Sequence, residues 1–245
     1  MTKEISMTKL DCRIGMRRSS CHWAFVILGL ALSLVAPNSF AADTNAVLDA
    51  WFAAQTNLQT WSADFVQTRA LKALTRPLVT TGHVWFAVPD RFHWELGRPA
   101  RTIALGEGDS MFVIYPLLRR AERYPMGETA PKQWRDLMSL LQAGLPRNRA
   151  EFESQFRVRS LVGTNGHWRL ALQPRSAAAR QLMPELRVTL ATNNLSLAGT
   201  ELVFMDGSRM RSDYTNAVLN APLDKKLFDW QPPPDYKIVE PLKSR

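Results

Sequence analysis

The sequence has little cysteine, and its two cysteines, Cys12 and Cys21, both lie near the N-terminus. The rest of the chain, from residue 42 onward, has no cysteine, so on its own it has no disulfide bond and no thiol chemistry. The remaining chain of about 204 residues must then be stable through packing alone. That length is enough for one β-rich domain with a sizeable core.

The sequence also lacks the motifs by which enzymes and metal sites are usually recognised. It has no G-x-S-x-G elbow, no phosphate-binding loop, no dinucleotide fingerprint and no H-E-x-x-H pair. Three histidines, His83, His93 and His167, lie outside the N-terminal segment, and none has the spacing of metal ligands. Because no residue can be assigned a catalytic role, we expect a protein that is not an enzyme and uses no metal or cofactor.

Long apolar runs are scarce, and the longest, residues 23–36 (WAFVILGLALSLVA), has 14 residues. A membrane-spanning helix needs roughly 20 residues. Basic residues precede the run, and small residues at Ser39 and Ala41 follow it, which predicts a signal peptide over residues 1–41 with cleavage after Ala41. The alternative is an uncleaved signal anchor. A lipoprotein signal is disfavoured because Cys21 precedes the apolar run.

Acidic residues are fewer than basic ones, so the net charge is +9, and it is +6 without residues 1–41. The basic residues are scattered, apart from a local cluster of Arg119, Arg120 and Arg123. This distribution favours a solvated surface with a weak attraction to anionic membranes. We expect no binding to nucleic acid, because an exported chain without a nucleic-acid motif gives no reason for it.

Apolar residues at helical spacing predict two long helices. The first begins at a cap among residues 43–45, presents Val47, Leu48, Trp51 and Phe52 on one face, and ends near Leu58 and Trp61. The second covers residues 131–142, with Pro131 in its first turn and Gly144 as its C-terminal cap.

The rest of the chain reads as short strands separated by turns, in an antiparallel meander rather than alternating βαβ units. A sheet of ten or eleven strands curls on itself, and its concave face must be filled, covered by helices or left as a cavity. We therefore predict one mainly β domain over residues 42–245. The expected strands are residues 62–71, 78–88, 91–96, 101–105, 111–115, 120–124, 153–161, 167–173, 185–192, 195–205, 209–219 and, at an edge, 236–239. A hairpin turn is expected over residues 106–109.

Several segments resemble the LolA family of periplasmic outer-membrane lipoprotein carrier proteins. The similar segments are Phe65-Val66-Gln67-Thr68, Gly82-His83-Val84-Trp85-Phe86, Pro89-Asp90-Arg91-Phe92-His93-Trp94-Glu95, Val113-Ile114-Tyr115-Pro116 and Leu227-Phe228-Asp229-Trp230-Gln231-Pro232-Pro233. The resemblance implies an incomplete antiparallel barrel of about eleven strands, covered by helices. It also implies an apolar cavity for the acyl chains of lipoproteins, an inner-membrane transporter that supplies the cargo, and an outer-membrane acceptor. We expect a monomer in the periplasm.

In such a fold the large apolar side chains of the sheet and the helices are the candidate lining of an acyl cavity. The candidates on the sheet are Phe86, Phe92, Trp94, Ile103, Phe112 and Ile114. Those on the helices are Leu48, Trp51, Phe52, Leu137, Leu140 and Leu141. Phe92 is the sharpest single candidate, because it begins a strand where the rim of the cavity is expected.

The sequence departs from the family pattern at one position of the rim. The family often has a basic residue just before the proline of the turn between the second and third strands, where it bonds to the helical lid. Here Val88 occupies that position, and Arg91 is the nearest candidate to replace it. A carrier or sensor of another lipid, such as an aryl-polyene lipid, therefore stays open as an alternative. A membrane-anchored structural or assembly module is a further alternative, and it predicts an uncleaved N-terminus.

Overall fold

The computed structural model describes residues 43–242, which form one twelve-stranded sheet with four α-helices. The helices are α1 (Thr44–Thr56), α2 (Lys132–Gln142), α3 (Arg149–Gln155) and α4 (Ala177–Leu182). The strands are β1 (Thr60–Ala70), β2 (Leu78–Ala87), β3 (Arg91–Leu96), β4 (Thr102–Glu107), β5 (Ser110–Tyr115), β6 (Arg120–Pro125), β7 (Phe156–Thr164), β8 (His167–Pro174), β9 (Glu185–Ala191), β10 (Leu197–Val203), β11 (Arg209–Leu219) and β12 (Lys237–Val239). The predicted signal peptide, residues 1–41, lies outside the described residues.

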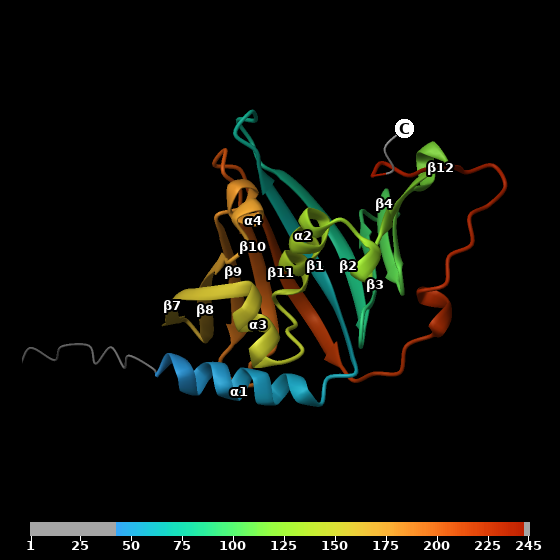
Figure 1. The fold of residues 1–245 in the computed structure, drawn as a ribbon. Helices are drawn as coiled ribbons and strands as arrows, with labels where there is room; N and C mark the ends of the chain where they lie inside the picture. The colour runs from blue at the N-terminus through green and yellow to red at the C-terminus, as the bar shows by residue number, and fades with distance from the viewer. Residues whose placement is uncertain (1–42, 243–245) are drawn as a thin grey trace, which may run out of the picture. The chain divides into compact units, whose positions relative to one another are not determined.

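The sheet is open, with β12 and β7 as its two edges, in the order β12-β6-β5-β4-β3-β2-β1-β11-β10-β9-β8-β7. Neighbouring strands pair antiparallel, except that β12 runs parallel to β6. The long-range pairing of β1 with β11 joins the two halves of the meander (Figure 1). The predicted class, a mainly β and unclosed barrel with helical cover, is confirmed, with twelve strands where about eleven were expected.

The strand register divides the sheet into two faces. Directly paired residues lie on the same face of an antiparallel sheet. The row Trp61–Phe86–Phe92–Gly106–Met111 runs across β1 to β5 and defines what we call the inner face. Figure 1 shows α2 in front of β1 and β2. The outer face is the opposite side.

The first helix begins where the sequence predicts, because the Asp43 carboxylate accepts a hydrogen bond from the amide of Asn45 at 2.9 Å. It ends at Thr56, and Trp61 belongs to β1 rather than to the helix end. Trp51 and Phe52 of α1 pack against Phe152 of α3, with ring centroids 5.5 and 5.4 Å apart. These contacts tie α1 to α3.

The predicted strand over residues 153–161 is wrong at its start. Residues Arg149–Gln155 form α3, and the strand begins only at Phe156. The Asn148 side chain accepts a hydrogen bond from the amide of Glu151 at 2.8 Å and caps this helix. The short helix α4, between β8 and β9, was not predicted either.

Gly106 was predicted to lie in a hairpin turn, but it lies within β4. A Cβ atom at Gly106 would lie 2.2 Å from the ring of Phe92, the residue paired with it on β3. Glycine is needed here because the aromatic ring lies flat over the neighbouring backbone.

Candidate functional site

A cavity of about 360 Å³ lies between the inner face of the sheet and the segment from α2 to α3. That size lies within the usual range of ligand pockets, roughly 300–1,000 Å³. We call residues 132–155, which contain α2, α3 and their connection, the lid. The lining is mostly apolar: Trp61, Val84, Phe86, Pro89, Phe92, Trp94, Leu96, Ala104, Met111, Met126, Met138, Leu140, Ala143, Gly144, Leu145, Pro146, Phe152, Phe156, Leu197, Leu202 and Met210, with the polar residues Gln67, Arg147, Glu151, Gln155, Thr200, Ser212 and Tyr214.

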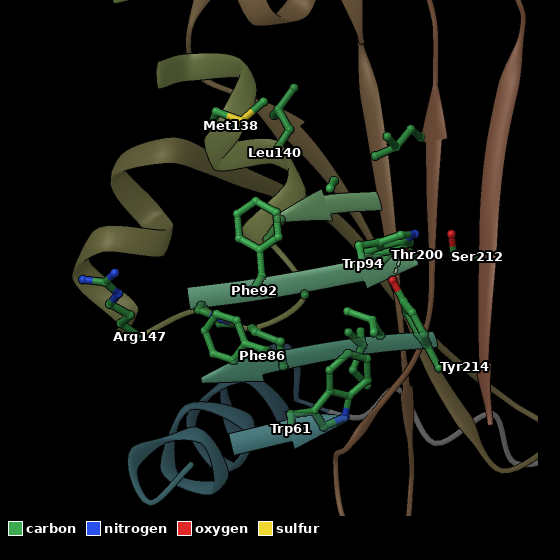
Figure 2. Close-up of a pocket in the computed structure, with 18 of the residues that line it drawn as sticks. Trp61, Phe86, Phe92, Trp94, Met138, Leu140, Arg147, Thr200, Ser212 and Tyr214 are labelled. Carbon is green, nitrogen blue, oxygen red and sulfur yellow. Dashed lines mark hydrogen bonds between the residues drawn. The ribbon is translucent and has the colours of Figure 1, made fainter. Parts of the chain in front are cut away.

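Aromatic side chains form much of the sheet side of the cavity. Phe86, Phe92 and Trp94 all project from the inner face (Figure 2). Figure 2 shows the ring of Phe92 rising from β3 toward Met138 and Leu140 of α2. The sheet and the lid therefore face each other across the cavity with apolar groups on both sides.

Four of the residues proposed from the sequence line this cavity: Phe86, Phe92, Trp94 and Leu140. Leu137 and Leu141 lie in α2, but their side chains are outside the part of the structure that is described. Four methionines, Met111, Met126, Met138 and Met210, also line it and were not proposed. Methionine is flexible and polarisable, and can adapt to contents of different shape.

Three sheet residues proposed for the cavity, Ile103, Phe112 and Ile114, lie on the outer face instead. They alternate with inner-face residues such as Ala104 and Met111, so the prediction of their direction is wrong. The strand Ser110–Tyr115 is apolar on both sides because both sides are covered, and alternation alone could not show which side holds the cavity.

The C-terminal segment covers that outer face. The Trp230 ring lies 5.3 Å from that of Phe112, and Phe228 is 1 % exposed. The Leu227 carbonyl oxygen lies 2.5 Å from Nδ1 of His93. A second apolar core is therefore present behind β3 to β6, on the side away from the cavity.

The helix α1 residues Leu48, Trp51 and Phe52 are buried, but they do not border the cavity. Trp51 and Phe52 pack against Phe152, which itself lines the cavity. The proposed place of all three residues as lining is therefore wrong, and Trp51 and Phe52 support α3 instead. The helical spacing predicted a buried face correctly but could not tell what covers it.

The two residues proposed for the rim, Val88 and Arg91, make the contacts that the structure describes with segments other than the lid. Val88 is 37 % exposed, and its amide donates to the Gln59 carbonyl oxygen. Arg91 points to the outer face, where its guanidinium lies 5.2 Å from the ring centroid of Phe228. Arg91 therefore does not replace a basic residue at the lid contact.

The lid itself supplies a basic residue that the sequence did not single out. Arg147 donates to the carbonyl oxygen of Pro89, in the turn between β2 and β3, at 2.5 Å. The contact thus joins the same two regions that the family resemblance suggested, but the charged side chain comes from the lid. Its place after α2 could be recognised only once the fold had brought residues 89 and 147 together.

Three further contacts hold α2. The Trp134 indole donates to the Pro125 carbonyl oxygen at 2.9 Å, and its ring stacks on Tyr124 at 4.7 Å. The Ser176 hydroxyl donates to the carboxylate of Asp136 at 2.5 Å. The hydrogen bond from Ser176 lowers the pKa of Asp136, which favours its charged form.

A row of polar side chains crosses the inner face within the apolar cavity. Thr200, Ser212 and Gln67 are paired in register on β10, β11 and β1. The Gln67 amide donates to the Ser212 hydroxyl at 3.4 Å, and the Thr200 and Tyr214 hydroxyls lie 3.3 Å apart. Burial raises the pKa of Tyr214 to about 12, so its hydroxyl keeps its proton. The sequence alone gave no reason to expect this row, because its members are far apart in the chain.

Comparison with known proteins gives a consistent assignment. Residues 56–231 match the family model described as "Outer membrane lipoprotein carrier protein LolA". An outer-membrane lipoprotein carrier protein of Chromohalobacter salexigens is 24 % identical over 220 residues, which cover 89 % of this chain and 96 % of that protein. Another, from Pseudoalteromonas translucida, is 27 % identical over 208 residues, covering 84 % of this chain and 91 % of that protein. The crystal structure of an uncharacterized conserved protein from Thermus thermophilus has a TM-score of 0.47 at 9 % identity, over 80 % of this chain and 98 % of that one. Because the family model covers well over half of its length, this chain belongs to the LolA family of outer membrane lipoprotein carrier proteins.

Proposed function

We propose that this protein carries acylated proteins through the periplasm, with their acyl chains held in the cavity between the sheet and the lid. The cavity with its apolar lining is the observation that supports this most directly. Each methylene group removed from water contributes about 0.8 kcal/mol, so a sixteen-carbon chain contributes on the order of 10 kcal/mol. A soluble carrier must offer comparable apolar surface, and lid and cargo then compete for it.

We further propose how the protein reaches the periplasm and how it receives and delivers its cargo. Residues 1–41 direct export and are removed, and residues 42–245 act as a monomeric carrier without a catalytic step or a cofactor. An inner-membrane transporter supplies the cargo, and an outer-membrane acceptor receives it. The names of the two bacterial relatives, both outer-membrane lipoprotein carrier proteins, support this assignment.

A matched pair of phenylalanine variants tests the cavity. Phe92 lines it, whereas Phe112 lies on the outer face of the same part of the sheet. We expect Phe92→Glu to weaken binding of a fluorescent fatty acid by about tenfold or more, because a charge in an apolar cavity is poorly solvated. Phe112→Glu should keep the affinity. Circular dichroism checks that both variants fold. Equal fatty-acid affinities of the two variants would contradict the proposal that acyl chains bind in the cavity.

The polar row of Thr200, Ser212 and Gln67 favours a second candidate, a carrier of another lipid. A plain acyl chain has no use for hydrogen-bonding groups in the middle of its cavity, whereas a chain that carries an oxygen-bearing group does. Mass spectrometry of material that copurifies with the protein separates the two. Acylated proteins support the first candidate, and free lipid of one kind supports the second.

A further inference from the structure

The connection between β1 and β2 projects from the sheet with apolar side chains in solvent. We call residues 70–79 the finger; the segment projects from the sheet (Figure 1). All of its residues are exposed. Leu71, Leu74, Leu78 and Val79 are each between 38 % and 61 % exposed. Four large aliphatic side chains on one projecting hairpin are unusual for a surface that meets only water.

The apolar surface continues onto the neighbouring turn. The amide of Lys72 donates to the Ser208 hydroxyl at 3.1 Å, which joins the finger to the turn between β10 and β11. Met205 in that turn is 62 % exposed, and its amide donates to the carbonyl oxygen of Leu182, itself 48 % exposed. Six large apolar side chains from three segments therefore gather at one end of the sheet.

All charged side chains of the finger are basic. The chain has no acidic residue from position 65 to position 89, whereas Arg69, Lys72 and Arg76 lie within that stretch. Lys72 and Arg76 are exposed and alternate with the leucines. The neighbouring turn contributes one carboxylate, Asp206, which accepts two hydrogen bonds from Ser208.

We propose that the finger, with Met205 and Leu182, docks the protein on the surface of an anionic phospholipid bilayer. Leucines that enter the headgroup region remove apolar area from water, while lysine and arginine beside them meet the lipid phosphates. Interleaved basic and aliphatic side chains on a convex, projecting hairpin suit such a surface better than they suit a protein groove. Docking of this kind is separate from the carrier function and does not depend on what the cavity holds.

Vesicle sedimentation tests the proposal with the chain from Ala42 onward, since every buried core residue of the described part lies between Leu48 and Phe228. We expect binding to vesicles of phosphatidylcholine mixed with phosphatidylglycerol, and weak binding to pure phosphatidylcholine. Lys72→Ser and Arg76→Ser should each weaken binding to the mixed vesicles by about fivefold. Leu74→Ser combined with Leu78→Ser should weaken it by about tenfold.

Val79 and Val162 form a matched control pair. Both are exposed valines in strands, at 61 % and 51 %, but Val162 lies on β7, the far edge strand. Only Val79→Ser should reduce vesicle binding. Finger variants should still bind the fluorescent fatty acid, and Phe92→Glu should still bind vesicles, which separates docking from filling of the cavity. Equal binding by Val79→Ser, the leucine double variant and the unchanged chain, or no binding to anionic vesicles, would overturn the proposal.

Discussion

Asp64, on the outer face of β1, contacts polar side chains from three other segments of the chain. Its carboxylate accepts hydrogen bonds from Asn216 on β11 and lies 3.0 Å from Nδ1 of His83 on β2. Arg98, in the connection after β3, forms an ion pair with it. The hydrogen bonds from Asn216 and His83 lower the pKa of Asp64 from 3.8 to about 2.

This shift predicts a dependence of stability on pH. A carboxyl whose pKa is lower in the folded state stabilises the fold fully above its unfolded pKa of 3.8, and this contribution is lost as the pH falls toward about 2. Because the side chain is partly exposed, we expect Asp64→Asn to cost about 1 kcal/mol of unfolding free energy at neutral pH. Urea titrations at neutral pH and near pH 2 measure it. The difference between the two proteins should shrink in acid; an unchanged difference would show that the lost interaction is not ionic.

At the scale of elements, the lid rests on the sheet through a close backbone contact. A Cβ atom at Gly144 would lie 2.9 Å from Cδ2 of Leu197 on β10. The sequence suggested that Gly144 caps α2, but the cap is Ala143. Glycine at 144 instead lets the connection between α2 and α3 approach the inner face.

We therefore expect Gly144→Val to loosen the lid, at a cost of about 1–3 kcal/mol for overpacking. Amide hydrogen exchange over residues 143–147 should become faster, while exchange in β8 and β9 stays the same. Adding Leu197→Ala removes the methyl groups that the new side chain meets, so the double variant should recover part of the protection. Unchanged exchange in Gly144→Val would show that this contact does not hold the lid.

The third helix shows what limited the prediction of elements. Glu151-Phe152-Glu153-Ser154-Gln155-Phe156 alternates enough to be read as a strand, yet Phe152 and Phe156 also have the four-residue spacing of a helix. Asn148 followed three residues later by Glu151 was the available sign of a helix start. The strand β3 was predicted with its observed bounds, because its apolar and polar residues alternate strictly from Arg91 to Leu96.

For the whole molecule, the important feature is that β3 to β6 are covered on both faces. The lid and cavity lie on one side, and the segment with Phe228 and Trp230 lies on the other. Because the core around Phe228 lies on the opposite side of the sheet from the cavity, it can stabilise the sheet while the cavity changes its contents. Among residues 43–242 no helix is long and apolar enough to span a membrane.

Phe228→Ala should accordingly destabilise the protein without affecting the cavity. Loss of a fully buried phenylalanine costs roughly 3 kcal/mol, and the melting temperature should fall. Leu117→Ala, at a site 80 % exposed, is the control and should change stability by less than about 0.5 kcal/mol. Fatty-acid affinity should stay the same in both. A large loss of affinity in Phe228→Ala would mean that the two sides of the sheet are coupled.

Local sequence patterns were enough to predict the class of fold, most strand positions, the family resemblance and four of the lining residues, because period-two alternation and turn residues are encoded over short stretches. The three-dimensional packing was needed to show which face of each strand meets the cavity, that α1 supports α3, and that Arg147 rather than Arg91 contacts the rim. It also brought Thr200, Ser212 and Gln67 into one row. Those features depend on pairings between residues up to about 145 positions apart, which local patterns do not specify.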